Sequence, residues 1–173
     1  PYKGLLQPRI EAEVAFVLAA DLPAAPVTAA DVAAATDHVV AAIEVCASRI
    51  AGWDITLFDT VADNASSGVF VMGAQPLALD DIADLPGAEM TVVSDGEVVS
   101  AGTGAACMGH PINAVVWLAN AVAEQGEPLR AGEIVLSGSL GPLVAARPGA
   151  TYEATITGLG SVSAVFGSDG GAA

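Results

Sequence analysis

The clearest alternation of apolar and polar positions lies near the start of the chain, in residues 9–18. Side chains alternate between the two faces of a strand, so this pattern predicts one apolar face, at Ile10, Ala12, Val14, Phe16 and Leu18. The opposite face carries Arg9, Glu11, Glu13 and Ala15. Neighbours on one face are about 6.6 Å apart at the backbone, which lets the two carboxylates converge on one point. Their like charges repel, so the pattern indicates a compensating cation, and a divalent metal ion is the obvious one.

Two segments have the pattern of covering helices. Thr28 and Asp31 form a capping-box pair, and a helix is expected over residues 29–42. His38 would then lie in the middle of this helix, as a surface or core residue. Pro111 is suited to the first helical position, and the apolar face that follows it predicts a second helix that ends near residue 125.

Short apolar runs between turn signals predict the remaining strands. They are expected at residues 45–50, 69–73, 90–93, 97–100, 132–137, 152–157 and 161–166. Glu44 opens the first of these and can point at the face of Glu11 and Glu13, while the run at 69–73 is expected to be buried. Because few helices separate the strands, the predicted fold class is α+β and mainly β, a mixed and largely antiparallel architecture with two covering helices.

Composition narrows the picture further. A length of 173 residues favours one domain, expected over residues 1–167, with a disordered tail at 168–173. The formal charge of -15, from 20 acidic and 5 basic residues, argues against nucleic acid or an anionic membrane as partner. Cys46 and Cys107 lie in apolar surroundings, and with no secretory signal they indicate free thiols in the reducing cytoplasm. The chain begins at Pro1 rather than Met, so we expect an N-terminal segment to be missing from it.

A third acidic residue, Glu44, is embedded in apolar sequence, where an unpaired charge would be costly. Glu11, Glu13 and Glu44 therefore make a candidate ligand set, and carboxylate oxygens suit a hard cation such as Mg²⁺ or Mn²⁺. Mg²⁺ keeps several of its waters, which leaves positions open to a chelating substrate. The alternative interpretation is a solvated strand face, with the third acid paired to Arg49.

Other polar segments have both a structural and a functional interpretation. Asn64 and Ser66, next to Asp63, either form a capped turn or hold a substrate carboxylate together with backbone N–H groups. His110 either caps the helix that follows it or belongs to a site. The loop at 138–141 lacks the lysine of a phosphate-binding P-loop, so it is interpreted as a tight turn that could line a pocket.

Six segments form a specific combination when they are taken together, at residues 7–18, 42–50, 59–68, 109–119, 138–142 and 158–162. This combination resembles the 2-keto-4-pentenoate hydratase family of the fumarylacetoacetate hydrolase superfamily, over nearly the whole chain. The resemblance implies a mixed β-sheet roll of the fumarylacetoacetase C-terminal-domain type and an oligomeric assembly. It also implies that Mg²⁺ or Mn²⁺ is held by Glu11, Glu13 and Glu44.

The activity implied by the resemblance is that of a hydro-lyase in the meta-cleavage catabolism of aromatic or steroid rings. Such a hydratase adds water to a 2-hydroxy-2,4-dienoate, through its 2-oxo-3-enoate tautomer, and gives a 4-hydroxy-2-oxo acid. In this chain Asp63, Asn64 and Ser66 would orient the substrate or water, and the loop with Ser139 and Leu140 would close the pocket. The resemblance further implies a cytoplasmic homo-oligomer that can associate with an aldolase or decarboxylase of the pathway.

Alternative activities stay open. An oxalocrotonate-type decarboxylase of the same superfamily, acting on a 2-oxo-3-enedioate, shares the metal site, and a C–C hydrolase of acylpyruvates is a weaker option. The chain could instead be a non-catalytic metal-binding scaffold subunit. Similar hydratases carry a further segment before the strand with Glu11, in which the lysine of a Gly-x-Lys motif is thought to act as acid and base. Lys3 lies too close to Glu11 to be that lysine.

Overall fold

The computed structural model describes residues 1–168, so the expected tail at 168–173 lies outside the described residues apart from Ser168. The first sheet consists of β1 (Arg9–Leu18), β2 (Thr36–Cys46), β3 (Val69–Met72), β6 (Ile134–Leu136) and β7 (Val144–Ala145). Its strand order is β3-β2-β1-β6, and β7 pairs with the opposite end of β1 from β6. β1 and β2 are the long central strands, and they position the site described below.

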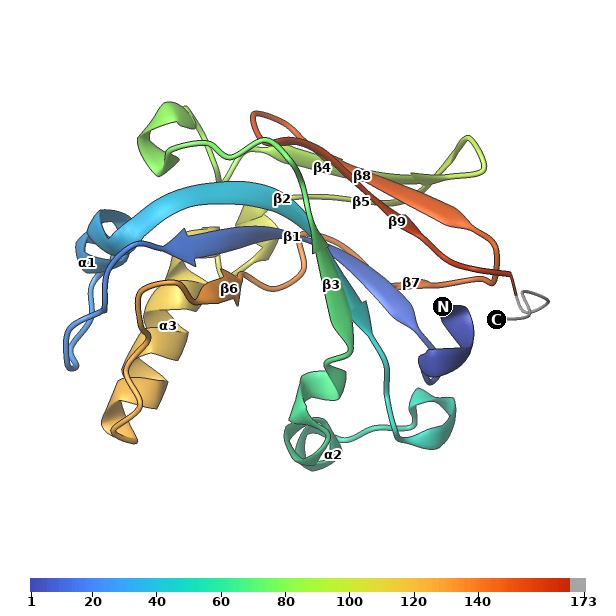
Figure 1. The fold of residues 1–173 in the computed structure, drawn as a ribbon, viewed down its shortest axis with the longest axis horizontal. Helices are drawn as coiled ribbons and strands as arrows, with labels where there is room; N and C mark the ends of the chain where they lie inside the picture. The colour runs from blue at the N-terminus through green and yellow to red at the C-terminus, as the bar shows by residue number, and fades with distance from the viewer. Residues whose placement is uncertain (169–173) are drawn as a thin grey trace.

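The second sheet lies above the first in Figure 1 and has the order β5-β4-β8-β9. Its strands are β4 (Glu89–Ser94), β5 (Glu97–Thr103), β8 (Thr151–Ile156) and β9 (Gly160–Val165). Asp95 and Gly96 both have positive φ in the turn between β4 and β5, which confirms the predicted hairpin. Every strand pairing in residues 1–168 is antiparallel, and the predicted mainly β, α+β class is confirmed.

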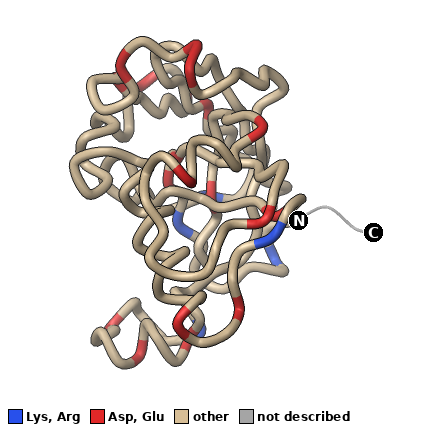
Figure 2. Tube along the Cα trace, turned by 90° about the vertical axis from the view of Figure 1, so that its left-hand side faces the viewer, with Lys and Arg blue, Asp and Glu red and all other residues tan. Residues whose placement is uncertain are grey.

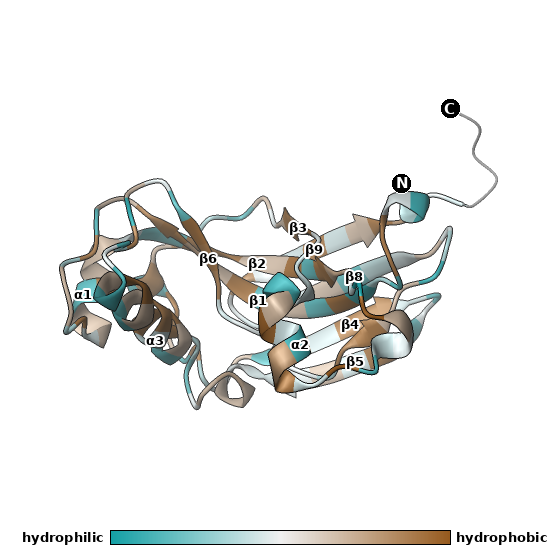
Figure 3. Cartoon of the chain, turned by 90° about the horizontal axis from the view of Figure 1, so that it is seen from below, coloured by the Kyte–Doolittle hydropathy of each residue, from teal (hydrophilic) through white to brown (hydrophobic). Residues whose placement is uncertain are grey.

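One apolar core fills the space between the two sheets. The predicted apolar face of β1 is confirmed, because its members are all at most 2% exposed: Ile10, Ala12, Val14, Phe16 and Leu18. Met90 and Tyr152 join this core from the second sheet, and Val32 and Val115 join it from α1 (Ala29–Ala35) and α3 (Pro111–Glu124). The second sheet and the two helices therefore cover the same face of β1, side by side along its length (Figure 3).

The boundary between the first helix and the second strand differs from the prediction. The capping box of Thr28 and Asp31 is present, but α1 ends at Ala35 and the chain continues as β2 from Thr36. The expected helix over 29–42 and the expected strand over 45–50 were therefore wrong, and His38 lies in a strand. The reason is that Val39 to Ile43 is buried on both faces, so its apolar run has no period that separates helix from strand.

The second predicted helix is confirmed, and the role of His110 is now defined. α3 begins at Pro111, and His110 Nδ1 accepts a hydrogen bond of 3.1 Å from the N–H of Ile112. This bond satisfies one of the free donors at the helix start. His110 is therefore a capping residue.

β3 is a strand, as predicted, but the prediction that it is buried was wrong. Val69, Phe70, Val71 and Met72 are between 37% and 52% exposed. β3 is an edge strand of the first sheet, and an edge strand keeps its outer side free unless another segment covers it. Four consecutive exposed apolar residues are thus a feature that the fold itself does not explain.

The surface is predominantly acidic. Figure 2 shows acidic positions distributed along the whole trace and basic positions at only a few places. Within residues 1–168, no helix combines the length and the apolar character needed to cross a membrane.

Candidate metal centre

The pairing of β1 with β2 places two acidic side chains opposite each other. Glu11 pairs with Glu44, and Glu13 pairs with Ala42 one step further along the same face. Directly opposite residues of an antiparallel pair project from the same face of the sheet. The structure therefore confirms the predicted convergence of the polar face of β1 with Glu44, although Glu44 lies inside β2 rather than at its start.

Cys46 joins these carboxylates. One ligand atom each from Glu11, Glu44 and Cys46 can be chosen so that all three lie within 4.8 Å of one another. The Cys46 thiol donates a hydrogen bond of 3.3 Å to Glu11 Oε2. Glu11 and Glu44 are half-buried and Cys46 is buried, so the cluster is only partly accessible to solvent.

Glu13 connects the cluster to the loop after β6. Its carboxylate is 1% exposed, and its Oε2 accepts a hydrogen bond of 2.6 Å from the N–H of Gly138. The next residue, Ser139, donates its hydroxyl to the Gly141 carbonyl, and its side chain opposes the rise in the pKa of Glu11. The predicted tight loop at 138–142 therefore lies against the acidic cluster.

Burial raises the pKa of all three carboxyl groups. The pKa of Glu13 is raised to about 8, mainly by burial. The hydrogen bond from Gly138 lowers this pKa, and the charges of Glu44 and Glu11 raise it further. Burial and then the charge of Glu11 raise the pKa of Glu44. Burial also raises the pKa of the Cys46 thiol, and the neighbouring carboxylates add to it, so this thiol stays protonated at neutral pH.

These residues fit a hard divalent cation. Among the described residues, no Lys or Arg forms an ion pair with any of the three carboxylates. Arg49, the predicted alternative partner of Glu44, pairs with Asp63 instead. A cluster of carboxylates whose pKa values are raised by burial and mutual repulsion is stabilised by a cation, and oxygen ligands suit Mg²⁺-like ions.

The second predicted group lies in the loop after α2 (Leu57–Ala62). The Asp63 carboxylate accepts hydrogen bonds from the hydroxyls of Ser48 and Ser66 and from the N–H of Arg49. Although burial opposes them, these bonds hold the pKa of Asp63 below its usual value. Asp63 therefore fastens the loop to the end of β2.

Asn64 and Ser66 differ in exposure. Asn64 is exposed, whereas Ser66 is buried, and the Ser66 carbonyl accepts a hydrogen bond from the N–H of Ala47, one residue beyond Cys46. This loop thus joins β2 next to the acidic cluster. Leu140 is fully buried in the main core, and its N–H donates to the Ala12 carbonyl. The substrate contacts expected of these residues stay predictions.

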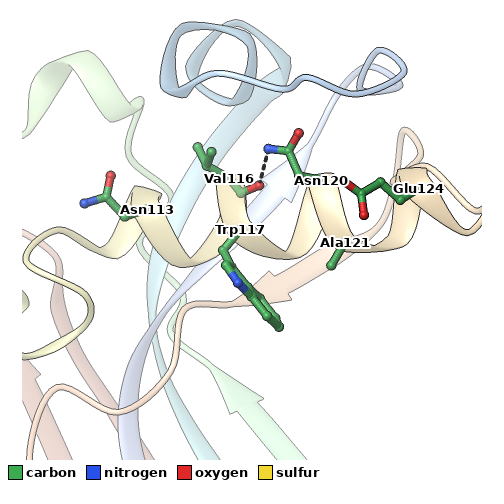
Figure 4. Close-up of a pocket in the computed structure, with 6 residues that line it drawn as sticks. All are labelled: Asn113, Val116, Trp117, Asn120, Ala121 and Glu124. Atoms are coloured by element: carbon green, nitrogen blue, oxygen red, sulfur yellow. Dashed lines mark hydrogen bonds between the residues drawn. The ribbon is translucent and has the colours of Figure 1, made fainter.

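A separate hollow of about 550 Å³ lies along the outer face of α3 (Figure 4). Its walls are one stripe of the helix: Asn113, Val116, Trp117, Asn120, Ala121 and Glu124. The polar atoms of Asn120 already have partners within the protein. Its side-chain oxygen accepts a hydrogen bond from the N–H of Val27, and its amide nitrogen donates to the carbonyls of Val27 and Val116. None of the clustered carboxylates lines this hollow, so it lies apart from the candidate metal site.

Cys46 is the member of the cluster that sequence reasoning missed. The sequence shows no His and Asp partners that would make it a nucleophile, and it was therefore treated as a buried thiol. A usable signal was present, since Cys46 follows Glu44 by two residues and shares its strand face. The expectation that Cys46 and Cys107 are buried free thiols is confirmed.

Comparison with known proteins adds to this geometry. The family model described as Fumarylacetoacetate (FAA) hydrolase C-terminal matches residues 3–166. A 2-keto-4-pentenoate hydratase from Burkholderia vietnamiensis is 56% identical over 166 residues, which cover 96% of this chain and 63% of that protein. A 2-hydroxyhexa-2,4-dienoate hydratase from Comamonas testosteroni is 48% identical and is matched over 94% of this chain and 61% of its own length.

A solved structure is also similar over most of the chain. The 4-oxalocrotonate decarboxylase from Pseudomonas putida G7, complexed with magnesium and adipate, superposes with a TM-score of 0.89 at 39% identity. The match covers 95% of this chain and 62% of the decarboxylase. The chain thus spans less than two thirds of the length of each of these relatives. The family match and the structural likeness confirm the predicted fold type.

Proposed function

The chain belongs to the fumarylacetoacetate hydrolase C-terminal family, and we propose that it is the metal-binding catalytic part of a hydratase. The reaction would add water to a 2-hydroxy-2,4-dienoate, through its 2-oxo-3-enoate tautomer, and give a 4-hydroxy-2-oxo acid. The observation that carries this proposal is that Glu11, Glu13 and Glu44 share one face of β1 and β2, and that no Lys or Arg among the described residues forms an ion pair with them. Relatives at 48% and 56% identity that are named hydratases of such dienoates support it.

Glu11, Glu13 and Glu44 would hold Mg²⁺ or Mn²⁺. When bound, such an ion supplies Lewis-acid stabilisation of the negative charge that develops on the oxygens of a 2-oxo acid. The solved decarboxylase holds magnesium, and this supports the choice of a hard divalent ion. The thiol of Cys46 holds Glu11 by its hydrogen bond, and the Gly138 N–H holds Glu13 in the same way.

The two loops beside the cluster have assigned roles in this proposal. The loop with Ser139 lies against Glu11, so its hydroxyl would orient a substrate carboxylate or water, while the buried Leu140 anchors that loop in the core. Asp63 would act with Asn64 and Ser66 to orient substrate or water at the end of β2. Asp63 stays ionised at neutral pH, because its hydrogen bonds hold its pKa low against the effect of burial.

The assembly around this site is also a proposal. We infer that residues 1–167 form one metal-binding domain of a cytoplasmic homo-oligomer in aromatic-ring catabolism, with possible contacts to a pathway aldolase or decarboxylase. Exposed apolar side chains on α2 support a protein interface, since Leu57, Phe58 and Val61 are between 73% and 85% exposed. Buried free thiols at Cys46 and Cys107 fit a reducing compartment.

A metal-binding experiment tests the assignment of the ligands. Isothermal titration of the chain with Mg²⁺ should give a binding signal that Glu11→Gln and Glu44→Gln each weaken at least tenfold. Glu97→Gln, an exposed acid on β5, is the matched control and should leave the signal unchanged. Unchanged Mg²⁺ affinity in both site variants would show that Glu11 and Glu44 are not metal ligands.

Oxalocrotonate-type decarboxylation is the second candidate, because a solved decarboxylase is 39% identical to this chain. The two reactions differ in their products. The full-length protein that contains this chain should convert 2-hydroxypenta-2,4-dienoate to a 4-hydroxy-2-oxo acid and release no CO₂ from 2-oxohex-3-enedioate. Release of CO₂ would favour the decarboxylase and reject the hydratase.

A further inference from the structure

The exposed edge strand β3 runs beside the acidic cluster. Phe70 pairs directly with Glu44, and Met72 pairs with Ala42. Opposite residues of an antiparallel pair share a face, with their Cβ atoms about 4.5–5.5 Å apart, so both apolar side chains stand on the face of the carboxylates. Across the same face, Ala42 pairs with Glu13 on β1. Glu13, Ala42 and Met72 therefore lie in one row across β1, β2 and β3.

The two faces of β3 have different surroundings. Val69 and Val71 project to the opposite face, where they line a hollow of about 110 Å³ together with Val45 and Phe166. Phe70 and Met72 project to the face of the carboxylates, where they are 47% and 37% exposed. Figure 3 shows β3 as a hydrophobic segment at the margin of the first sheet. Two exposed apolar side chains at the edge of a polar cluster are typical of a binding site with one apolar end.

We propose that Phe70 and Met72 form the apolar wall of the substrate site and select acids with an uncharged hydrocarbon tail. This inference depends on the proposed function, because it takes the head of the substrate to be a 2-oxo acid held at the carboxylate cluster. Ala42, between Glu13 and Met72, is fully buried, so the open approach from the cluster to the wall lies beside Phe70, which stands opposite the half-buried Glu44. The tail of the acid can therefore pass Glu44 and lie against Phe70, with Met72 next to it on the same face of β3.

The charges around the wall exclude a second carboxylate at that end of the substrate. Neither β2 nor β3 contains Lys or Arg. Arg49, the basic residue nearest in sequence to β2, pairs with Asp63, and the guanidinium of Arg9 lies 4.3 Å from the ring centroid of Trp53. A tail carboxylate beside Phe70 would therefore face the like charge of Glu44, with no Lys or Arg of β2 or β3 to pair with it. The wall accordingly fits a monocarboxylic 2-hydroxydienoate and disfavours a dicarboxylic one.

Stable 2-oxo acids test the wall without requiring turnover. Titration of the Mg²⁺-loaded chain with pyruvate, 2-oxobutanoate, 2-oxopentanoate and 2-oxohexanoate should show affinity rising about threefold to fourfold per methylene. 2-Oxohexanedioate, which has a carboxylate at the tail, should bind at least tenfold more weakly than 2-oxohexanoate. In Phe70→Ala and Met72→Ala the increment per methylene should fall to less than twofold, while pyruvate affinity stays the same.

Val71→Ala is the control, because it removes exposed apolar side-chain atoms from the other face of the same strand. It should keep the full increment per methylene. Affinity that does not grow with tail length in the wild type, or an increment that Phe70→Ala leaves intact, overturns the inference. So does a change in oligomer size in Phe70→Ala with an intact increment, because β3 would then be a protein interface. Failure of pyruvate itself to bind would overturn the proposed function, and this inference with it.

Discussion

At the scale of single residues, the decisive observation is that Glu13 is 1% exposed and lies beside two further carboxyl groups. Burial of one ionised carboxylate is costly, and like charges nearby increase that cost. Only a bound proton or a bound cation relieves it here, since no basic side chain among the described residues pairs with the cluster. The arrangement of these carboxyl groups therefore favours binding of a cation, as proposed above.

The pH dependence of stability follows from the raised pKa of Glu13. In the folded protein this pKa is about 8, above the value of 4.5 expected for the unfolded chain, so the metal-free protein loses stability as pH rises between these values. Glu13→Gln should remove that loss, because its amide oxygen still accepts from Gly138. The free energy of unfolding of the variant, measured with urea in the presence of a chelator, is compared with that of the wild type. The difference in favour of the variant should be larger at pH 8 than at pH 5 by roughly 1 kcal/mol or more. An equal difference at both pH values would contradict the assignment, and Glu97→Gln is the control.

The Cys46 thiol is expected to act by position. Its S–H donates to Glu11 Oε2, and its raised pKa keeps that proton in place. Cys46→Ala should weaken Mg²⁺ binding about threefold to tenfold, which corresponds to the roughly 0.5–1.5 kcal/mol of a typical hydrogen bond. Cys46→Ser keeps a donor and should recover most of the affinity in the same titration. Wild-type affinity in Cys46→Ala would show that the thiol only fills space.

At the scale of elements, the site depends on contacts between segments that are distant in sequence. β1 and β2 supply the acids, and the loop after β6 holds one of them through Gly138. That loop is fixed in turn by β5, because a Cβ at Gly102 would overlap the Leu140 carbonyl oxygen. Only glycine permits this approach of two backbones.

Gly102→Ala should therefore act on the fold and on the site together. The clash with backbone atoms of Leu140 should cost about 1–3 kcal/mol in urea unfolding, as is typical of overpacking. It should also lower Mg²⁺ affinity, since Gly138 lies in the displaced loop. Gly4→Ala is the control, because nothing lies within 4 Å of the added Cβ. Normal Mg²⁺ affinity in a destabilised Gly102→Ala would separate the loop from the metal site.

At the scale of the whole molecule, charge and exposed apolar surface point to ligands and partners. A formal charge of -15 disfavours the compact state through self-repulsion, and a divalent ion bound at the carboxylate cluster would reduce that repulsion. Exposed apolar residues gather on α2 and β3, away from the main core. The chain spans 63% of the Burkholderia hydratase, so relatives contain further residues that could cover such surface.

Metal binding should raise the thermal stability of the whole chain. At a Mg²⁺ concentration one hundred times the Kd, binding adds about 2.7 kcal/mol, which corresponds to a midpoint increase of roughly 5–10 °C for a domain of this size. NaCl at equal ionic strength is the control for general screening of the acidic surface. Glu44→Gln should respond to Mg²⁺ no more than to NaCl. A wild-type response equal to that in NaCl would mean that the carboxylates bind no specific ion.

The amino-acid sequence by itself determined the features that depend on local pattern. Alternation with period two predicted the faces of β1, and turn and cap signals predicted the β4–β5 hairpin and the start of α3. The combination of short segments around Glu11 and Glu44 was specific enough to identify the family. Such signals act over a few residues, so they can be read without knowledge of the partners that each segment meets.

Tertiary structure alone decided which segments face each other. The run that became β2 is apolar on both faces, and only its long pairing with β1 makes it a strand and sets Glu44 opposite Glu11. The exposure of β3, the bond from Cys46 to Glu11 and the contact of Gly138 with Glu13 likewise join residues that are far apart in the chain. Periodicity within one segment carries no information about the register between two segments, which is why these contacts could not be predicted.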